Sequence, residues 1–410
     1  MPDHLRRISM PSALSIVINN PSIRIGALAI LFFGFSNAAT APYQAVIGIR
    51  EIGLSNTVYS LLMLFAAVIN VSASVLMGIV ADRLGEYRKP MLLIALFGVS
   101  GYLLVYLVGN AMAFISAKLV LLPIFGAMNS LIFAHVRADA RNLSTGDMIA
   151  VNSIMRATIS LSWVLVPGIV GIFLVNSGNM LLAFLFSGIC ALICFLLVAF
   201  CLPRAATPAT VNTEARFGLR ASLAEIGSRR VLLRIIAIAL ICSMLHLNDS
   251  IRSLIITGQA QGTVADIGIV AGIVAALEIV FILLWGWIEK KVPQTLTLAA
   301  GAVLYAIYLI LQGLASAPWH IYAQTVISAL GAAAIISIPI TYLQELIADR
   351  PGLGSSLIAV NIFLGAGLGA LIFAVGTLVT SYSGTSILGA VVGLGGVYML
   401  YALDGTGRRR

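Results

Sequence analysis

The chain has 410 residues, of which 60% are hydrophobic and 10% are charged, and its formal net charge is +9. About half of the residues in a soluble globular domain are apolar, so this composition excludes that class. The basic excess does not indicate a nucleic-acid partner, because no basic stripe with interleaved aromatic residues accompanies it. The composition therefore predicts a protein that crosses a membrane many times.

Apolar runs lie between short clusters of charge along the whole chain. About 20 apolar residues are needed for one helical span, and a helix satisfies its own backbone groups in hydrocarbon. The sequence therefore predicts an all-α polytopic membrane protein with twelve transmembrane helices. The predicted spans lie near residues 23–48, 58–81, 90–109, 112–136, 149–174, 178–202, 232–258, 266–288, 294–314, 318–345, 354–380 and 384–403.

The basic residues predict the side that each loop faces. Twelve spans place both termini on one side, and cytoplasmic loops are rich in Lys and Arg. On the opposite side the loops contain Arg50 as their only Lys or Arg, while Lys118, Arg156 and Arg252 lie within spans. Both termini are therefore predicted to be cytoplasmic. We call the predicted cytoplasmic side inner and the opposite side outer.

The longest polar segment divides the spans into two sets of six. It predicts an N-terminal six-helix half at residues 1–202, a basic cytoplasmic linker at 203–230 and a C-terminal six-helix half at 231–410. Many secondary transporters consist of two such halves with a substrate site between them.

A basic loop with two glycines lies between the second and third spans. It reads Gly78-Ile79-Val80-Ala81-Asp82-Arg83-Leu84-Gly85-Glu86-Tyr87-Arg88-Lys89. This segment resembles the G-x-x-x-D-R-x-G-R-R-[RK] loop of the major facilitator superfamily, although Glu86 and Tyr87 replace the usual Arg pair. The resemblance implies a gating loop formed by Gly78, Asp82, Arg83, Gly85 and Arg88. Physically, Gly78 would permit close helix packing and the basic residues would lie at the anionic leaflet, as in any positive-inside loop.

Three further segments resemble the bacterial sugar efflux transporter family of that superfamily. They are Arg156-Ala157-Thr158-Ile159-Ser160-Leu161-Ser162-Trp163-Val164 with Pro167, then Ala276-Leu277-Glu278-Ile279, and then Tyr342-Leu343-Gln344-Glu345-Leu346 followed by Pro351, Gly352 and Asn361. The resemblance implies a major facilitator fold in the bacterial inner membrane, surrounded by lipid. It further implies a monomer without a cofactor that exports sugars or related small polar solutes in exchange for protons, by alternating access.

Two charged residues lie at similar depths in different spans. Arg156 is about two turns from the inner end of span five, and Glu278 is about three turns from the inner end of span eight. A charge at the bilayer centre costs at least about 2.5 kcal/mol, so each residue needs a partner or a water-filled cavity. The fold that the resemblance implies makes spans five and eight face each other. One hypothesis is an Arg156–Glu278 ion pair or a shared substrate hydroxyl, and the other is two unrelated packing contacts.

Span seven carries His246, Asp249 and Arg252 at three-residue intervals. This spacing places all three on one helical face. Asp249 is either neutralised by Arg252 or exchanges a proton with His246 during transport, and the sequence favours neither. The candidate proton-coupling residues are therefore Asp249, Glu278 and His246.

Neutral polar side chains in the spans could bind sugar hydroxyls, and an aromatic ring could stack against the C–H face of a sugar. Each polar residue could equally bond a neighbouring helix, because an unsatisfied polar group in lipid is costly. The candidate substrate-binding residues are Asn37, Gln44, Asn70, Arg156, Trp163, Glu278, Gln344 and Asn361.

Two kinds of small or rigid residue predict local helix geometry. The run Gly365-Ala366-Gly367-Leu368-Gly369 resembles a dinucleotide-binding fingerprint, but it lies inside an apolar span without a preceding strand, which favours close helix packing by Gly365 and Gly369 instead. Four prolines inside spans predict breaks or kinks with free carbonyls: Pro42, Pro123, Pro167 and Pro339.

The motif content predicts that the protein is not an enzyme. The sequence contains no H-E-x-x-H, no G-x-S-x-G and no P-loop, and it shows no metal-ligand spacing. Because one fold hosts many substrates, a multidrug or other metabolite exporter of the same fold is the alternative to a sugar exporter. A nontransporting membrane sensor is the alternative from another class.

Overall fold

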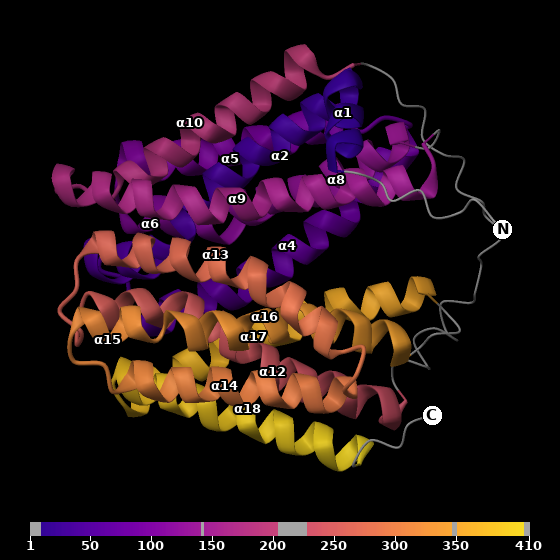
Figure 1. The fold of residues 1–410 in the computed structure, drawn as a ribbon. Helices are drawn as coiled ribbons and strands as arrows, with labels where there is room; N and C mark the ends of the chain where they lie inside the picture. Colours follow the sequence, from indigo (N-terminus) through magenta and orange to yellow (C-terminus); the bar gives the residue numbers. More distant parts are fainter. Residues whose placement is uncertain (1–9, 141–142, 204–227, 347–350, 406–410) are drawn as a thin grey trace. The chain divides into compact units, whose positions relative to one another are not determined.

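The computed structural model describes residues 10–140, 143–203, 228–346 and 351–405, and within these ranges every regular element is a helix (Figure 1). Contacts between residues group the chain into two compact units. Unit 1 comprises Met1–Thr40, Ile69–Val166 and Leu181–Val211, and unit 2 comprises Ala41–Val68, Pro167–Met180 and Asn212–Arg410. The predicted linker at 203–230 lies mostly outside the described residues, so the division into halves at that segment stays a prediction.

The predicted number of spans is confirmed. Among the described residues, twelve helical segments are long and apolar enough to cross a membrane: Pro21–Glu51, Asn56–Ala81, Arg88–Val108, Ala111–Asp139, Gly146–Ser177, Leu182–Cys201, Val231–Ile256, Val264–Ile288, Gln294–Gly313, Thr325–Leu346, Leu357–Val379 and Tyr382–Asp404. The tenth begins later than predicted, because residues 318–323 form the separate helix α15 (Pro318–Ala323). Gln324 ends α15, and its amide Nε2 donates to the Leu311 carbonyl (3.1 Å).

The spans near two of the prolines are irregular. α1 (Met10–Asn19) precedes α2 (Pro21–Thr40), which ends before Pro42, and the span continues through η1 (Ala41–Tyr43), α3 (Gln44–Val46) and η2 (Ile47–Glu51). The fourth span comprises α6 (Ala111–Ser116), the π-helical η3 (Ala117–Leu121), α7 (Leu122–Gly126) and α8 (Met128–Asp139), with Pro123 as the second residue of α7. Proline removes a backbone donor and clashes with the preceding turn, which explains the breaks. Pro167 and Pro339 instead lie inside continuous helices.

Unit 1 has an aromatic core. α10 (Leu182–Leu196), which continues as η5 (Leu197–Cys201), packs on α2 and α5 (Arg88–Val108). Ring centroids lie between 5.1 and 6.2 Å apart along a row formed by Phe33, Phe125, Tyr102 and Phe184. A Cβ at Gly98 would lie 2.4 Å from the Phe125 ring, so this glycine makes room for the row. α4 (Asn56–Leu84) and α9 (Thr145–Ser177) contribute residues to both units.

Unit 2 contains α12 (Arg229–Ile256), α13 (Val264–Ile288), α14 (Gln294–Gly313), α16 (Thr325–Leu346), α17 (Pro351–Val379) and α18 (Tyr382–Asp404) (Figure 1). α12 packs against α17 and α18, and α16 packs against α13 and α14. A Cβ at Gly369 would lie 2.9 Å from His246 Cβ, and one at Gly365 would lie 3.1 Å from Cys242 Cβ. The predicted close packing at these two glycines is therefore confirmed.

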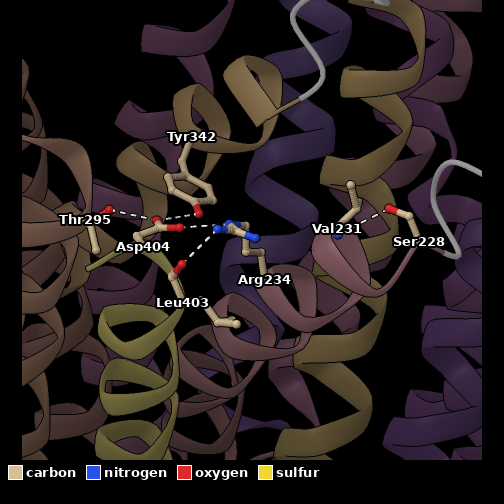
Figure 2. A network of polar contacts seen from close by, with 7 residues as sticks. All are labelled: Ser228, Val231, Arg234, Thr295, Tyr342, Leu403 and Asp404. Carbon is tan, nitrogen blue, oxygen red and sulfur yellow. Dashed lines mark hydrogen bonds and ion pairs between the residues drawn. The ribbon is translucent and has the colours of Figure 1, made fainter. Parts of the chain in front are cut away.

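A polar network joins the inner ends of four helices in unit 2 (Figure 2). Asp404, at the end of α18, accepts from Arg234 Nε (2.8 Å), Thr295 Oγ1 (3.0 Å) and the Tyr342 hydroxyl (2.7 Å). Arg234 Nη2 also donates to the Leu403 carbonyl (3.0 Å). One carboxylate therefore fixes the inner ends of α12, α14, α16 and α18 to one another.

Candidate functional site

The predicted charged face of span seven belongs to α12 in unit 2. Asp249 is exposed, whereas His246 and Arg252 are half-buried, and all three lie inside the span Val231–Ile256. His246 interacts electrostatically with Asp249 and lies close to α17, since a Cβ at Gly365 would be 3.3 Å from His246 Cδ2. An exposed carboxylate within a span is tolerated only where it meets water or a counter-ion.

Glu278 on α13 completes a group of charges in unit 2. It is half-buried and interacts electrostatically with both Arg252 and Asp249. We call His246, Asp249, Arg252 and Glu278 the charge cluster. With both carboxylates ionised and His246 neutral, the cluster has one guanidinium for two carboxylates. Uptake of a single proton by either carboxylate makes it neutral.

Two buried tyrosines of α14 border the charge cluster. The ring centroids of Tyr305 and Tyr308 are 5.3 Å apart, and each side chain is 2% exposed. Tyr305 interacts electrostatically with Asp249, Arg252 and Glu278. The charge cluster is therefore lined by phenol groups, which can both donate and accept hydrogen bonds.

A hydrogen-bonded chain continues from Tyr308 to α18. The Tyr308 hydroxyl lies 3.3 Å from Asn248 Oδ1 and also bonds Gln312 Oε1, and Gln312 Nε2 lies 3.4 Å from Ser386 Oγ. These residues were not predicted from the sequence, because tyrosine and serine are ordinary constituents of an apolar span. The spacing of Tyr305, Tyr308 and Gln312 along one helical face was the available signal.

Asn361, a predicted substrate-binding residue, lies in the interior of unit 2. It is 4% exposed, and its Nδ2 donates to Cys242 Sγ (3.4 Å). Its Oδ1 is buried and has no hydrogen-bond partner among the described residues. A buried amide oxygen without a partner is costly, so Asn361 has one acceptor available for a water or a ligand.

Two predicted binding asparagines of unit 1 use their amides within the protein. Asn37 Nδ2 donates to Phe33 O of its own helix (2.9 Å), and Asn70 Nδ2 donates to Pro123 O (2.8 Å). The Asn70 side chain packs against Gly126, where an added Cβ would lie 2.2 Å from Asn70 Nδ2. At both residues the side-chain amide therefore bonds a helix carbonyl, which was the alternative to sugar binding that the sequence allowed.

The other predicted binding residues are distributed over both units. In unit 1, Arg156 is exposed and Trp163 is half-buried, both on α9. In unit 2, Gln44 is half-buried, and Gln344 is exposed two residues before the end of α16. The structure brings Glu278 together with Arg252, and the Arg156–Glu278 pair stays a prediction.

The predicted gating loop lies at the inner end of α4. Gly85, which follows the last residue of α4, has φ +69, a conformation that favours glycine. Arg88 Nε donates to Val198 O (3.1 Å) and its Nη2 bonds Ala199 O, so Arg88 binds the final turns of the sixth span. Arg83 is exposed, and the side chain of Asp82 lies outside the described part of the chain.

The close packing expected at Gly78 is wrong. A Cβ built at Gly78 meets no described atom within 4 Å, because this residue faces open space on α4. The described residues also contain no group of three or more His, Cys, Asp or Glu that could hold a metal ion.

Comparisons with known proteins are consistent with this arrangement of helices. A family model described as Major Facilitator Superfamily matches residues 26–370. The "Putative sugar efflux transporter" of Deinococcus radiodurans is 26% identical over 372 residues, which cover 90% of this chain and 94% of that protein.

Solved structures show the same fold at low identity. The nucleoside transporter NupG is 14% identical with a TM-score of 0.79, over 95% of this chain and all of that chain. The peptide transporter POT in complex with sulfate is also 14% identical, with a TM-score of 0.73 over 93% of each chain. At these identities the likeness concerns the arrangement of helices alone.

Proposed function

Because the chain belongs to the major facilitator superfamily and is thus a multi-pass membrane transporter, not an enzyme, we propose that it exports sugars or related small polar solutes in exchange for protons. Alternating access of two six-helix halves in the bacterial inner membrane, with both termini cytoplasmic, is part of this proposal. The relative named as a sugar efflux transporter covers nearly the whole chain and supports this class of substrate. The shared fold alone would not support any particular substrate, since proteins of one fold bind many different substrates.

The proposed coupling of solute export to proton entry rests on one observation, the charge cluster of α12 and α13. Two carboxylates inside the spans, Asp249 and Glu278, interact electrostatically with each other, and Glu278 also interacts with Arg252. Because a net charge within the bilayer is costly, this group is suited to exchange one proton as its surroundings change. Intramembrane carboxylates of this kind serve as proton relays in transporters.

The exchange follows from competition between proton and solute. When the cluster is open to the acidic outer side, Glu278 or Asp249 takes a proton and the solute leaves. When it is open to the inner side, the proton leaves and the ionised carboxylate accepts hydrogen bonds from the hydroxyls of an arriving solute. Tyr305, which is buried beside the carboxylates, carries a hydroxyl that can donate or accept a hydrogen bond there.

Uptake into everted membrane vesicles tests this proposal. Respiration acidifies the vesicle interior, which corresponds to the outer side, so a sugar/proton exchanger accumulates radiolabelled lactose or a glucoside. We expect an uncoupler, Glu278→Gln or Asp249→Asn to abolish accumulation. Glu289→Gln is the matched control, since Glu289 follows α13 directly, lies outside the charge cluster and accepts from Thr341 Oγ1 (3.0 Å).

Uptake assays with several different solutes distinguish the sugar exporter from the two alternative functions, an exporter of another solute and a sensor. Accumulation of a drug or a different metabolite, with every sugar excluded, would replace the substrate while retaining the exchange. Absence of flux for every solute, with the protein present and folded in the vesicles, would contradict transport of the tested classes and favour a sensor.

A further inference from the structure

Two neighbouring side chains at the outer end of α16 have buried polar atoms without a hydrogen-bond partner among the described residues. They are Gln324 Oε1 and Ser328 Oγ. Gln324 is 9% exposed and Ser328 is 2% exposed. The Ser328 backbone nitrogen donates to the Gln324 carbonyl (2.9 Å), so the two side chains are one helical turn apart and share a face. An unpartnered buried polar group is costly, so both atoms require a partner.

The Gln324 amide cannot satisfy its oxygen by turning over. Its Nε2 already donates to the Leu311 carbonyl of α14 (3.1 Å). A flipped amide would place its oxygen against that carbonyl oxygen, and both atoms can only accept hydrogen bonds. Gln324 therefore keeps an acceptor without a donor beside α14.

The Tyr308 hydroxyl of α14 is a third polar group at this place, since α14 packs against α16. Tyr308 interacts with both Ser328 and Arg252. Its hydroxyl faces two acceptors, Gln312 Oε1 and, at 3.3 Å, Asn248 Oδ1. Its single hydrogen is used by these acceptors, and its two lone pairs can still accept hydrogen bonds.

One water molecule matches these three groups. It can donate to Gln324 Oε1 and to the Tyr308 oxygen, and it can accept from the Ser328 hydroxyl. Buried waters make about three hydrogen bonds, typically to groups that otherwise lack partners. A metal cation is a poorer match, because the positively charged Arg252 interacts with the same tyrosine hydroxyl. We call Gln324, Ser328 and Tyr308 the water site.

The water site lies between the outer end of the tenth span and the charge cluster. Gln324 directly precedes the span Thr325–Leu346, and Ser328 is one turn further in. The ring of Tyr305 is 5.3 Å from that of Tyr308, and Tyr305 interacts with both carboxylates of the charge cluster. A row of polar groups inside unit 2 therefore leads from the outer end of α16 to these carboxylates.

We propose that the water site binds a buried water through which protons reach the charge cluster from the outer side. The inference rests on the proton exchange proposed above. The three side chains are at most 9% exposed, so water fits where a sugar would not, and the proton route is separate from the path of the solute. Each hydroxyl or water on this route releases one proton as it accepts another, so none of them changes its charge.

The charge cluster attracts the proton along this route. The guanidinium of Arg252, which interacts with Tyr308, would by itself repel an excess proton. With both carboxylates ionised, however, the cluster has a net negative charge. Arrival of one proton at Glu278 or Asp249 removes that charge, so the driving force ends when the cluster is neutral.

Hydroxyl-radical footprinting of the full-length protein in nanodiscs tests the water site without any solute. X-ray radiolysis of a bound water labels the side chains beside it, so we expect label on Tyr308 although it is only 2% exposed. Ser328→Val removes the hydroxyl and places a methyl group toward the water, so labelling of Tyr308 should fall several-fold. Ser337→Val on the same helix is the matched control, since Ser337 Oγ already donates to the Ala333 carbonyl (2.7 Å).

Unchanged labelling of Tyr308 in a folded Ser328→Val protein would overturn the water site. If Ser328→Val does not fold, Gln324→Met replaces it, because methionine keeps the length of the side chain and removes the acceptor. Gln294→Met is then the control, since Gln294 Nε2 likewise donates to a single partner, Glu345 Oε1 (3.0 Å). The same two outcomes apply.

Two transport modes in proteoliposomes test the proton route. Exchange of labelled for unlabelled lactose needs no net proton movement, whereas lactose transport driven by an imposed pH difference does. We expect Ser328→Val to slow the pH-driven mode on the order of tenfold and to leave the exchange mode unchanged, because a positioned group for proton transfer is lost. Equal effects on both modes, or no effect on either, would overturn the proton route.

Failure of the proposed function gives a different pattern. Absence of both transport modes in the parental protein would refute the proposed sugar/proton exchange and with it the proton route. The water site would still stand if the labelling of Tyr308 depended on Ser328.

Discussion

Arg234 and Asp404 form an ion pair that joins α12 to α18, with Arg234 Nε 2.8 Å from Asp404 Oδ1. Their side chains are only 13% and 17% exposed. We predict that Asp404→Asn lowers the unfolding free energy in detergent by about 3 kcal/mol, because Arg234 then keeps its charge without a counter-ion. Chemical unfolding followed by circular dichroism measures the loss.

An exposed ion pair of unit 1 is the control for that prediction. Lys89 Nζ lies 3.3 Å from Glu86 Oε1, and the Lys89 side chain is 71% exposed. Because solvent screens such a pair, Lys89→Gln is expected to change stability by less than about 1 kcal/mol. Equal losses in Asp404→Asn and Lys89→Gln would show that burial of the Arg234 pair has no effect.

We predict that Asn70 stabilises the protein and does not bind the solute. Asn70→Ala removes the hydrogen bond to Pro123 O and is expected to lower stability by about 1 kcal/mol. Gly126→Ala should produce a similar loss, since it displaces the Asn70 amide. Transport assays and unfolding of both variants provide the measurement. A several-fold rise in KM for Asn70→Ala at unchanged stability would instead identify Asn70 as a binding residue.

Gly369 is predicted to tolerate no larger side chain. Gly369→Val forces atoms against His246 Cβ and the Leu247 backbone, and we expect a loss of roughly 1–3 kcal/mol in stability. Gly367→Ala, two residues away on α17, would meet only the flexible end of Leu64 at 3.3 Å and should be nearly neutral. Comparison of the two unfolding midpoints measures the difference. If both variants unfold at the parental midpoint, α12 and α17 do not pack as closely as described.

Arg252 is predicted to be more important than Arg156 for the carboxylates of the charge cluster. Arg252→Gln leaves Asp249 and Glu278 without their nearby guanidinium, so exchange should fall by about tenfold or more. The double variant Arg252→Gln/Asp249→Asn restores the charge balance and should recover folding and expression relative to the single variant. Arg156→Gln measured in the same vesicles completes the comparison. A larger loss in Arg156→Gln than in Arg252→Gln would favour the Arg156–Glu278 pair.

The sequence was sufficient to predict the helices, but it did not predict which residues the charged and polar side chains contact. Apolar runs between charge clusters located all twelve spans, because length and hydropathy alone decide whether a helix can cross a bilayer. The close packing at Gly365 and Gly369 was also predictable, since small residues four apart share a helical face. A glycine inside a span does not always mark close packing, because Gly78 on α4 faces open space.

The partners of the polar side chains depended on tertiary packing. Asn70 and Asn361 are the same residue type in similar apolar surroundings, yet Asn70 bonds a carbonyl beside Gly126 and Asn361 keeps an unpaired buried oxygen. Arg50 was identified as the only basic residue of the outer loops, but its bonds to the end of α12 join residues about two hundred positions apart. No local pattern encodes such a contact.

Proton movement driven by a solute gradient is the decisive measurement for sugar/proton exchange. Purified protein is reconstituted into proteoliposomes that contain a pH-sensitive dye, and a gradient of the transported sugar is imposed without any initial pH difference. We predict that protons move against the direction of the sugar, that Glu278→Gln or Asp249→Asn abolishes this movement, and that Glu289→Gln preserves it. Sugar flux without proton movement, or with protons moving in the same direction as the sugar, would contradict the proposed exchange.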